Sequence, residues 1–260
     1  SRQPFKPMRV IDENSVDKVK NMKDNYRKMN LDCLVILGGN GTQKTANLLR
    51  EEGLNVVSLP KTIDNDVWGT DMTFGFHSSV EIATNVIDCI HTTATSHGRI
   101  FCVEIMGHKV GWLPLYAGIA GGADVILIPE IPYDIDKVAK TLNNRIAKGK
   151  KFSILAVAEG ALSKEEAAMK KKDFKKARAD MKHPSIVYRI ADELSTRVDN
   201  EIRVCVPGHF QRGGSPCAYD RVLSTRFGAA AAQLIRDKNH GNMVGLVNGK
   251  IVPVPLGEVA

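Results

Sequence analysis

Two carboxylates, Asp64 and Asp66, are the residues of this sequence best suited to chemistry. They lie in an acidic turn, residues 59–66 (L-P-K-T-I-D-N-D), at the end of a short apolar run. An earlier apolar run, residues 31–37, ends in a glycine-rich turn, residues 38–42 (G-G-N-G-T). Glycines let backbone N–H groups approach phosphate oxygens, and carboxylates bind Mg²⁺ or accept a proton from an attacking hydroxyl. Together, the two turns are typical of phosphoryl transfer.

Two further polar turns follow apolar runs later in the chain. They are residues 106–112 (M-G-H-K-V-G-W) and residues 208–216 (G-H-F-Q-R-G-G-S-P). A single glycine turn is weakly specific, because tight strand-to-helix turns generally use glycine and G-G-x-G-T also suits lipid kinases and nicotinamide-dinucleotide kinases. Several strand-end turns rich in glycine and cations are difficult to explain as independent surface loops. We therefore treat these turns as parts of one site.

The elements that must position these turns alternate along the chain. Near-continuous apolar runs predict strands buried on both faces of a parallel sheet, and the segments between them have helical patterns. This alternation predicts a doubly wound α/β architecture, in which ligands bind at the carboxyl ends of the strands. The predicted strands are residues 33–37, 56–59, 100–105, 125–128, 153–158, 203–206 and 244–247. The predicted helices are residues 15–29, 42–52, 76–96, 111–121, 135–148, 164–181, 185–197 and 218–237.

Composition indicates a globular protein of ordinary type. The chain has 260 residues, of which 43% are hydrophobic and 25% charged. No apolar run approaches the roughly 20 residues that span a bilayer. Five cysteines without metal-ligand spacing indicate reduced thiols and a cytoplasmic protein. Much of the net charge of +7 lies in residues 164–182, where Phe174 is the one aromatic residue. We interpret this segment as a solvated helix face and not as a nucleic-acid site.

In order along the chain, these turns resemble the phosphofructokinase patterns G-G-D-G-[ST], P-x-T-I-D-N-D, M-G-R-x-x-G and G-H-x-Q-R-G-G-x-P. The resemblance extends from about Arg2 to about Pro255. It implies two doubly wound α/β sandwich domains with mostly parallel sheets and an active site in the cleft between them. Residues 1–75 with 211–260 would bind the donor, and residues 76–210 would bind fructose 6-phosphate. It also implies that an upstream segment, with the family's first strand and its own glycine loop, is missing.

The resemblance implies transfer of a phosphoryl group from ATP or pyrophosphate to the 1-hydroxyl of fructose 6-phosphate. Asp64 would be the general base, and Thr62 and Asp66 would help position the hydroxyl or the metal-bound phosphate. Mg²⁺, near Asn40 and Asp66, would neutralise charge on the donor. The remaining donor-binding residues implied in this way are Arg2, Gly39, Gly41, Thr42 and Lys61.

The acceptor site is implied in the same way. Arg99 and Arg203 match arginines that reach into a neighbouring subunit and bind the 6-phosphate, for which the planar guanidinium fork is suited. The active sites would then be shared within a homo-oligomer, a dimer or a tetramer. Alternatively, both arginines are surface charges that flank strands, and His209 is a loop histidine with a structural partner. The other implied acceptor residues are Met106, Gly107, His108, Glu159 and Arg212.

Two departures from the family patterns leave alternatives open. Asn40 replaces an aspartate, which removes a negative charge near the metal, and His108 replaces an arginine, so a regulatory sugar-phosphate-binding paralogue with weak catalysis is one alternative. A kinase of another superfamily is a second alternative, against which the later turns argue. Gly41 leaves room for a nucleotide, whereas Lys61 is typical of pyrophosphate users. We expect ATP as donor, with pyrophosphate as the alternative.

Overall fold

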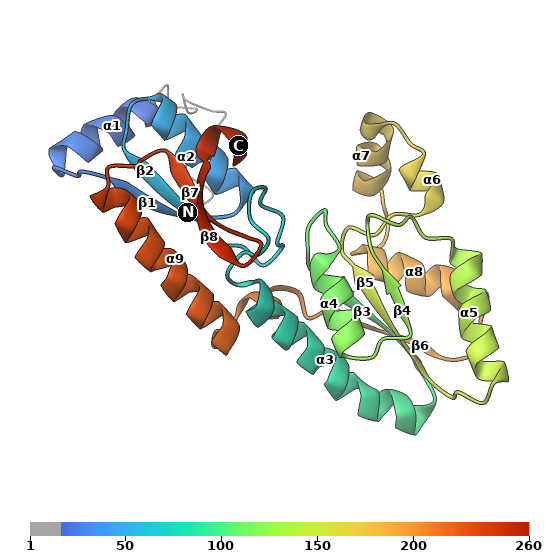
Figure 1. Ribbon diagram of the computed structural model, residues 1–260. Helices are drawn as coiled ribbons and strands as arrows, with labels where there is room; N and C mark the ends of the chain where they lie inside the picture. The colour runs from blue at the N-terminus through green and yellow to red at the C-terminus, as the bar shows by residue number, and fades with distance from the viewer. Residues whose placement is uncertain (1–16, 260) are drawn as a thin grey trace. The chain divides into compact units, whose positions relative to one another are not determined.

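The computed structural model describes residues 17–259 (Figure 1). Backbone contacts divide the chain into two compact units. The first contains the described residues up to Gly75 and those from Ala218 onward, and the second runs from Phe76 to Cys217. Within residues 17–259, no helix combines the length and apolarity that crossing a bilayer requires.

The first unit contains a four-stranded sheet in the order β1-β2-β7-β8. Neighbouring strands are parallel as far as β7, and β8 is antiparallel to β7. Gly38 lies opposite Pro60, so β1 and β2 end side by side and the turns that follow them start from adjacent positions. The strands are β1 (Leu34–Gly38), β2 (Val56–Pro60), β7 (Asn242–Val247) and β8 (Lys250–Pro255).

Helices cover both faces of this sheet. On one face, Ala46 and Leu49 of α2 pack with Val56, and α1 and α10 pack beside them. On the other face, Phe227 of α9 packs with Val57. The three-residue spacing of Ala46 and Leu49 places both side chains on the buried stripe of an amphipathic helix. The helices are α1 (Lys18–Lys28), α2 (Asn40–Glu51), α9 (Ala218–Arg236) and α10 (Leu256–Val259).

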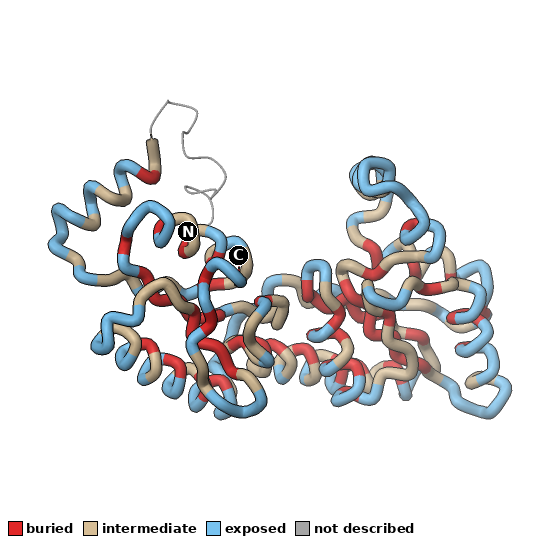
Figure 2. The backbone as a smooth tube through the Cα atoms, turned by 45° about the horizontal axis from the view of Figure 1, so that its top comes forward, coloured by how far each residue is buried: buried red, intermediate tan, exposed pale blue. Residues whose placement is uncertain are grey.

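The second unit contains a parallel sheet in the order β4-β5-β3-β6. Buried residues, in red, lie in the interior of the unit (Figure 2). The strand β5 is buried at every position. A strand buried on both faces needs mostly apolar side chains, which explains the run I-L-A-V-A that follows Ser153 in β5. The strands are β3 (Ile100–Ile105), β4 (Val125–Leu127), β5 (Ser153–Ala158) and β6 (Ile202–Cys205).

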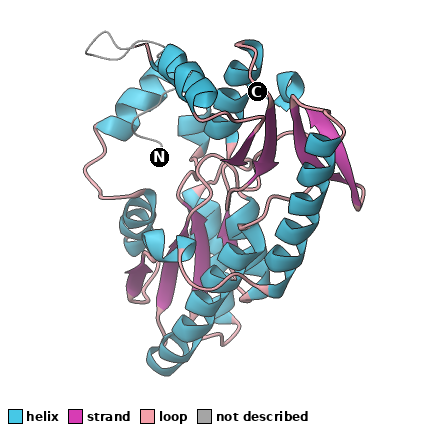
Figure 3. Ribbon diagram, turned by 90° about the vertical axis from the view of Figure 1, so that its left-hand side faces the viewer, coloured by secondary structure: helices cyan, strands magenta, loops and turns pink. Residues whose placement is uncertain are grey.

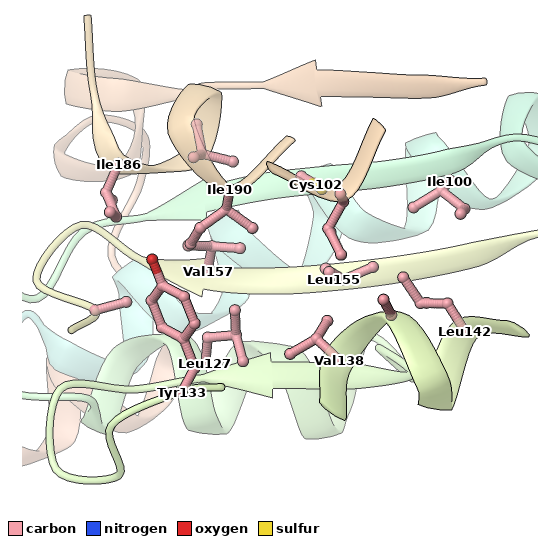
Figure 4. Packing of buried hydrophobic residues seen from close by; sticks show 14 of the residues in the cluster. Ile100, Cys102, Leu127, Tyr133, Val138, Leu142, Leu155, Val157, Ile186 and Ile190 are labelled. Atoms are coloured by element: carbon pink, nitrogen blue, oxygen red, sulfur yellow. The ribbon is translucent and has the colours of Figure 1, made fainter. Parts of the chain in front are cut away.

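Helices again lie on both faces of the sheet (Figure 3). Leu142 of α5 and Ile190 of α8 pack with Cys102, Leu155 and Val157 in one cluster (Figure 4). The opposite face is covered by α3, which contacts β3 and β5, and by α4, which contacts β4 and β5. The helical segments are α3 (Phe76–His97), α4 (Trp112–Ala120), α5 (Ile135–Ala147), α6 (Lys164–Ala167), α7 (Lys171–Ala179), α8 (Ile186–Ser195) and the 3₁₀ turn η1 (Gly208–Arg212).

The predicted fold class, α/β with mostly parallel sheets, is confirmed. The prediction of a single helix over residues 164–181 is wrong, because α6 ends at Ala167 and α7 starts at Lys171. Ser163 and Glu166 form a capping box that starts α6, and the backbone of Lys170 is extended with ψ 146°. The antiparallel strand β8 was not predicted.

The second crossover between the units also differs from the expected position. The sequence places it between residues 210 and 211, whereas the contacts place it between Cys217 and Ala218. Gln211 explains the difference, since it is 1% exposed and its carbonyl accepts a hydrogen bond from Ser79 Oγ at 2.8 Å. Residues 211–217 therefore belong to the unit that contains α3.

Candidate active site

The glycine-rich turn joins β1 to α2 in the first unit. Gly38 cannot carry a side chain, because a Cβ there would lie 2.3 Å from Thr42 Oγ1. Gly39 is the extended N-cap residue of α2, and its carbonyl accepts from Thr42 N and Gln43 N at 2.8 and 3.0 Å. At Gly41, by contrast, a Cβ would meet no atom of the described residues within 4 Å. The first turn of α2 is therefore open at Gly41, at a helix end that favours negative charge.

The acidic turn that follows β2 is held by residues 71–74. Thr62 O accepts from Thr73 Oγ1 at 2.9 Å, and Asn65 Oδ1 accepts from Thr73 N at 2.8 Å. Asn65 has a left-handed φ of 52°, which asparagine adopts more readily than most residues. Thr62 Oγ1 also accepts from Asp64 N at 3.3 Å. These bonds fix the backbone from which the two carboxylates project.

The two turns meet within the first unit. Asn40 Nδ2 donates to Asp66 Oδ2 at 2.7 Å and to Asp66 O at 2.9 Å. A Cβ on Gly39 would lie 3.2 Å from Thr62 Cβ, so the two backbones approach as closely as glycine permits. The structure thus brings together Gly39, Asn40, Thr62 and Asp66 at the carboxyl ends of β1 and β2, where ligands bind in parallel sheets.

The residue types at this point suit a magnesium ion, although Asn40 directs its NH₂ group and not its amide oxygen toward Asp66. The carboxylate of Asp66 and the amide oxygen of Asn40 are the hard oxygen ligands that Mg²⁺ prefers. Among residues 17–259, no group of three or more His, Cys, Asp or Glu side chains is placed to hold a metal. Asn40 and Asp66 offer few protein ligands, which suits Mg²⁺ because this ion keeps several waters and takes phosphate oxygens as further ligands.

Gln43 joins the same region and is absent from the residues predicted for the site. It is fully buried; its Nε2 donates to Gly38 O and Leu59 O, and its Oε1 accepts from Ser58 Oγ at 2.6 Å. One side chain thereby ties the end of β1 to the end of β2. The sequence did contain an indication of this role, because Gln43 is a polar residue three positions before Ala46, on the apolar stripe of α2.

In the second unit, side chains from separate segments hold the loop after β3. Gln211 Oε1 accepts from Met106 N at 3.1 Å. Glu159 Oε1 accepts from Gly107 N at 3.2 Å and from His108 N at 2.5 Å. Glu130 Oε1 accepts from Gly111 N at 2.8 Å, within the same loop. Of these three acceptors, only Glu159 was predicted from the sequence as a site residue.

Close backbone packing explains the glycines of this loop. Gly107 has a φ of 147°, and a Cβ there would lie 2.6 Å from Val110 O. A Cβ on Gly160 would lie 2.4 Å from His108 O. The carboxylate of Glu159 thus fixes the loop, while its predicted contact with sugar hydroxyls stays a prediction.

The turn η1 presents two of the predicted acceptor residues. His209 and Arg212 are exposed, whereas Gln211 between them is buried. Gln211 Nε2 donates to Gly208 O at 3.2 Å, and its Oε1 contacts Met106 N, so one side chain links η1 to the loop after β3. The second unit therefore brings η1, the loop and Glu159 together at the carboxyl ends of β3 and β5.

Arg99 and Arg203 lie at the opposite end of this sheet. Arg99 immediately precedes β3, and Arg203 is the second residue of β6. The six residues of β3 span about 20 Å, so these arginines are separated from Met106 and Gly107 by most of the sheet. The structure does not bring Arg99 and Arg203 to the acceptor loop of their own unit. Arg2 lies outside the described residues.

Comparisons with known proteins identify the same family as the sequence motifs. The family model described as Phosphofructokinase matches residues 5–235. The chain is 55% identical to an ATP-dependent 6-phosphofructokinase of Spirochaeta thermophila and 48% identical to one of Bacteroides thetaiotaomicron, in each case over 99% of this chain and 71% of the relative.

Solved structures give the same result for the fold. A phosphofructokinase from Saccharomyces cerevisiae is 32% identical with a TM-score of 0.80, over 93% of this chain and 34% of the yeast chain. A pyrophosphate-dependent phosphofructokinase from Marinobacter aquaeolei is 21% identical with a TM-score of 0.75, over 93% of this chain and 63% of that chain. At that identity the latter likeness concerns the fold alone.

Proposed function

The chain belongs to the phosphofructokinase family, and on this basis we propose that the intact protein transfers a phosphoryl group from ATP to the 1-hydroxyl of fructose 6-phosphate. The observation that carries this proposal is the meeting of the glycine-rich and acidic turns at the carboxyl ends of β1 and β2. In this arrangement Asp66 contacts Asn40 of the glycine-rich turn, and Asp66 lies in the same short segment as Asp64. The relatives named above are ATP-dependent enzymes, which supports ATP as the donor.

On the donor side, Gly39, Gly41 and Thr42 would bind phosphate oxygens at the start of α2. The open space at Gly41 leaves room for a nucleotide, and the ammonium of Lys61 adds positive charge. Asn40 and Asp66 would hold Mg²⁺, which when bound neutralises the charge on the donor oxygens. These residue roles extend the family resemblance and form part of the proposal.

In the reaction itself, Asp64 would act on the acceptor. Its carboxylate takes the proton of the 1-hydroxyl as the sugar oxygen forms its bond to phosphorus, and the donor leaves with the bridging oxygen. The bonds of Thr62 and Asn65 with Thr73 hold the acidic turn in place for this step. A fixed base contributes by position as well as by basicity.

On the acceptor side, the loop after β3, Glu159, His209 and Arg212 would bind the sugar. Arg99 and Arg203 would bind a 6-phosphate in a neighbouring protomer. Their position at the amino ends of β3 and β6 supports this, because a sugar phosphate at the carboxyl ends lies most of a strand length away. A homo-oligomer with shared active sites follows from this arrangement.

The donor is tested by assaying the intact protein with ATP and with pyrophosphate at saturating fructose 6-phosphate. We expect faster turnover with ATP. A clear preference for pyrophosphate would indicate that Lys61, and not the open space at Gly41, determines the donor. Binding of fructose 6-phosphate without turnover on either donor would identify the regulatory paralogue, which the departures at Asn40 and His108 favour.

The base is tested by Asp64→Ala. We expect turnover to fall by about 10²- to 10⁴-fold, the usual contribution of a general base, with little change in the affinity for fructose 6-phosphate. Steady-state kinetics and direct sugar-phosphate binding measure the two effects. Asp173→Ala, at an exposed position of α7, is the matched control. Near-native turnover of Asp64→Ala would remove Asp64 from this role.

A further inference from the structure

A carboxylate lies between the two arginines at the amino end of the second sheet. In the parallel pair β3 and β6, Ile100 is opposite Ile202 and Phe101 is opposite Arg203, so Arg99 is opposite Glu201. Glu201 and Arg203 are two residues apart, and alternate strand residues project from the same face. Ile100 N donates to Glu201 O at 3.0 Å, which continues the strand pairing up to this position.

Glu201 uses one oxygen for each arginine. Its Oε2 accepts from Arg99 Nε, and its Oε1 pairs with Arg203 Nη2. The hydrogen bond from Arg99 first, and then the charges of Arg203 and Arg99, lower the pKa of the Glu201 carboxyl, so it is ionised at neutral pH. The three side chains are 25% (Arg99), 47% (Glu201) and 53% (Arg203) exposed, so the cluster faces solvent.

This geometry leaves most of each guanidinium available. A guanidinium carries five N–H donors, and Glu201 engages one nitrogen of each arginine. Without the carboxylate, the two like charges would repel each other and the two long side chains would sample many rotamers. With it, the cluster retains a net charge of +1 and presents two forks that match phosphate oxygens.

We propose that Glu201 is a positioning residue that holds Arg99 and Arg203 together as a preassembled receptor for a sugar 6-phosphate. The inference rests on the proposed function and deepens it, since it concerns how the phosphate-binding pair is organised. Glu201 does not touch the sugar. It acts through the two arginines by lowering the cost of ordering them before the phosphate arrives.

The expected effect falls on acceptor binding. Glu201→Ala should raise the KM for fructose 6-phosphate by roughly three- to tenfold, the range for a partly exposed ion-pair cluster, and should leave kcat and the KM for ATP nearly unchanged. Glu201→Gln should give a smaller increase, because its amide oxygen accepts from one arginine while its NH₂ group opposes the other. An unchanged or lower KM in Glu201→Ala would overturn the proposal, since the carboxylate would then be inert or a competitor of phosphate.

A double-mutant comparison separates positioning from a general structural role. In a background that already carries Arg99→Ala and Arg203→Ala, Glu201→Ala should have no further effect on the KM for fructose 6-phosphate. A full effect in that background would also overturn the proposal. Asp136→Ala, which removes the exposed ion pair of Asp136 with Arg197 in the same unit, is the control and should leave this KM unchanged.

The unmodified intact protein and its oligomeric state are measured in the same series. Absence of turnover in the unmodified protein would count against the proposed function, whereas normal turnover with an unaltered KM in Glu201→Ala would count against this inference alone. Loss of assembly in both Glu201→Ala and Glu201→Gln would identify Glu201 as an assembly residue and overturn the positioning role.

Discussion

At the scale of single residues, the turn after β1 contains two glycines that are required for different reasons. The fold itself requires glycine at position 38, because a Cβ on Gly38 would collide with the side chain of Thr42. Among residues 17–259, no atom opposes a side chain at Gly41. A glycine that the fold does not require is best explained by what binds beside it, which in the proposed function would be the phosphoryl donor.

Gly41→Asp tests this explanation. The folded protein should be as stable as before, because aspartate in the first turn of a helix is compatible with the helix dipole and improves on glycine in propensity. Use of ATP should fall by more than about tenfold through charge repulsion and blocked space, with pyrophosphate less affected. Thermal unfolding and kinetics with both donors provide the measurement.

Gly38→Ala is the matched control for that experiment. It should lower the melting temperature, since the added Cβ lies 2.5 Å from Thr42 Cβ. If Gly41→Asp kept near-native kcat/KM for ATP, the interpretation of Gly41 as a space for the nucleotide would be wrong.

At the scale of elements, α6 is a single turn held by one buried carboxylate. The side chain of Glu166 is 5% exposed and pairs with Arg178 Nε at 2.8 Å and Arg189 Nη2 at 2.7 Å. It also accepts from Ser163 N at 3.0 Å in the capping box. Glu166 therefore joins α6, α7 and α8, and it anchors the lysine-rich segment to the core of the second unit.

Glu166→Gln should destabilise this unit by about 3–5 kcal/mol, because it leaves two arginines without their anion. Burial raises the pKa of Glu166, but the hydrogen bonds from Arg189 and Ser163 and the charges of both arginines outweigh it, so the net pKa is lowered. A lowered folded pKa gives stability that is present above the ordinary glutamate range and lost as pH falls through the folded value.

The difference in melting temperature between Glu166→Gln and the unmodified protein should therefore shrink as pH falls below the usual glutamate pKa. Thermal unfolding between neutral and acidic pH measures it. Asp173→Asn, at an exposed position of α7, is the control and should change little. A difference that persists undiminished at acidic pH would show that charge does not carry the effect.

Sequence patterns predicted the helices and strands correctly where the burial of apolar side chains determines the element. The runs at β3 and β5 are apolar except for Glu104 and Ser153 and gave correct bounds, and the helix patterns of α3 and α9 are long enough to be unambiguous. The break between α6 and α7 depends on the ion pair of Glu166 with Arg189, which is 23 residues away in the sequence. The strand β8 depends on its pairing with β7. Such contacts leave no periodic signal.

At the scale of the whole molecule, the family patterns named the loops of the site but not the side chains that support them. Gln43, Gln211 and Glu130 satisfy backbone groups of the predicted loops and were not predicted as site residues. Their roles depend on which backbone atoms face them after folding. Motifs locate the residues that face a ligand, whereas the supporting bonds become visible only in three dimensions.

The separation of Arg203 from the acceptor loop of its own unit has a genetic consequence. Two defective forms, Asp64→Ala and Arg203→Ala, should complement each other when co-expressed. Under the proposed sharing of active sites, a mixed dimer would contain one centre with an intact base from one chain and an intact arginine from the other. Random mixing should then restore about a quarter of the normal rate at low fructose 6-phosphate. If the co-expressed mixture were no more active than either variant alone, each polypeptide would contain a complete active site of its own.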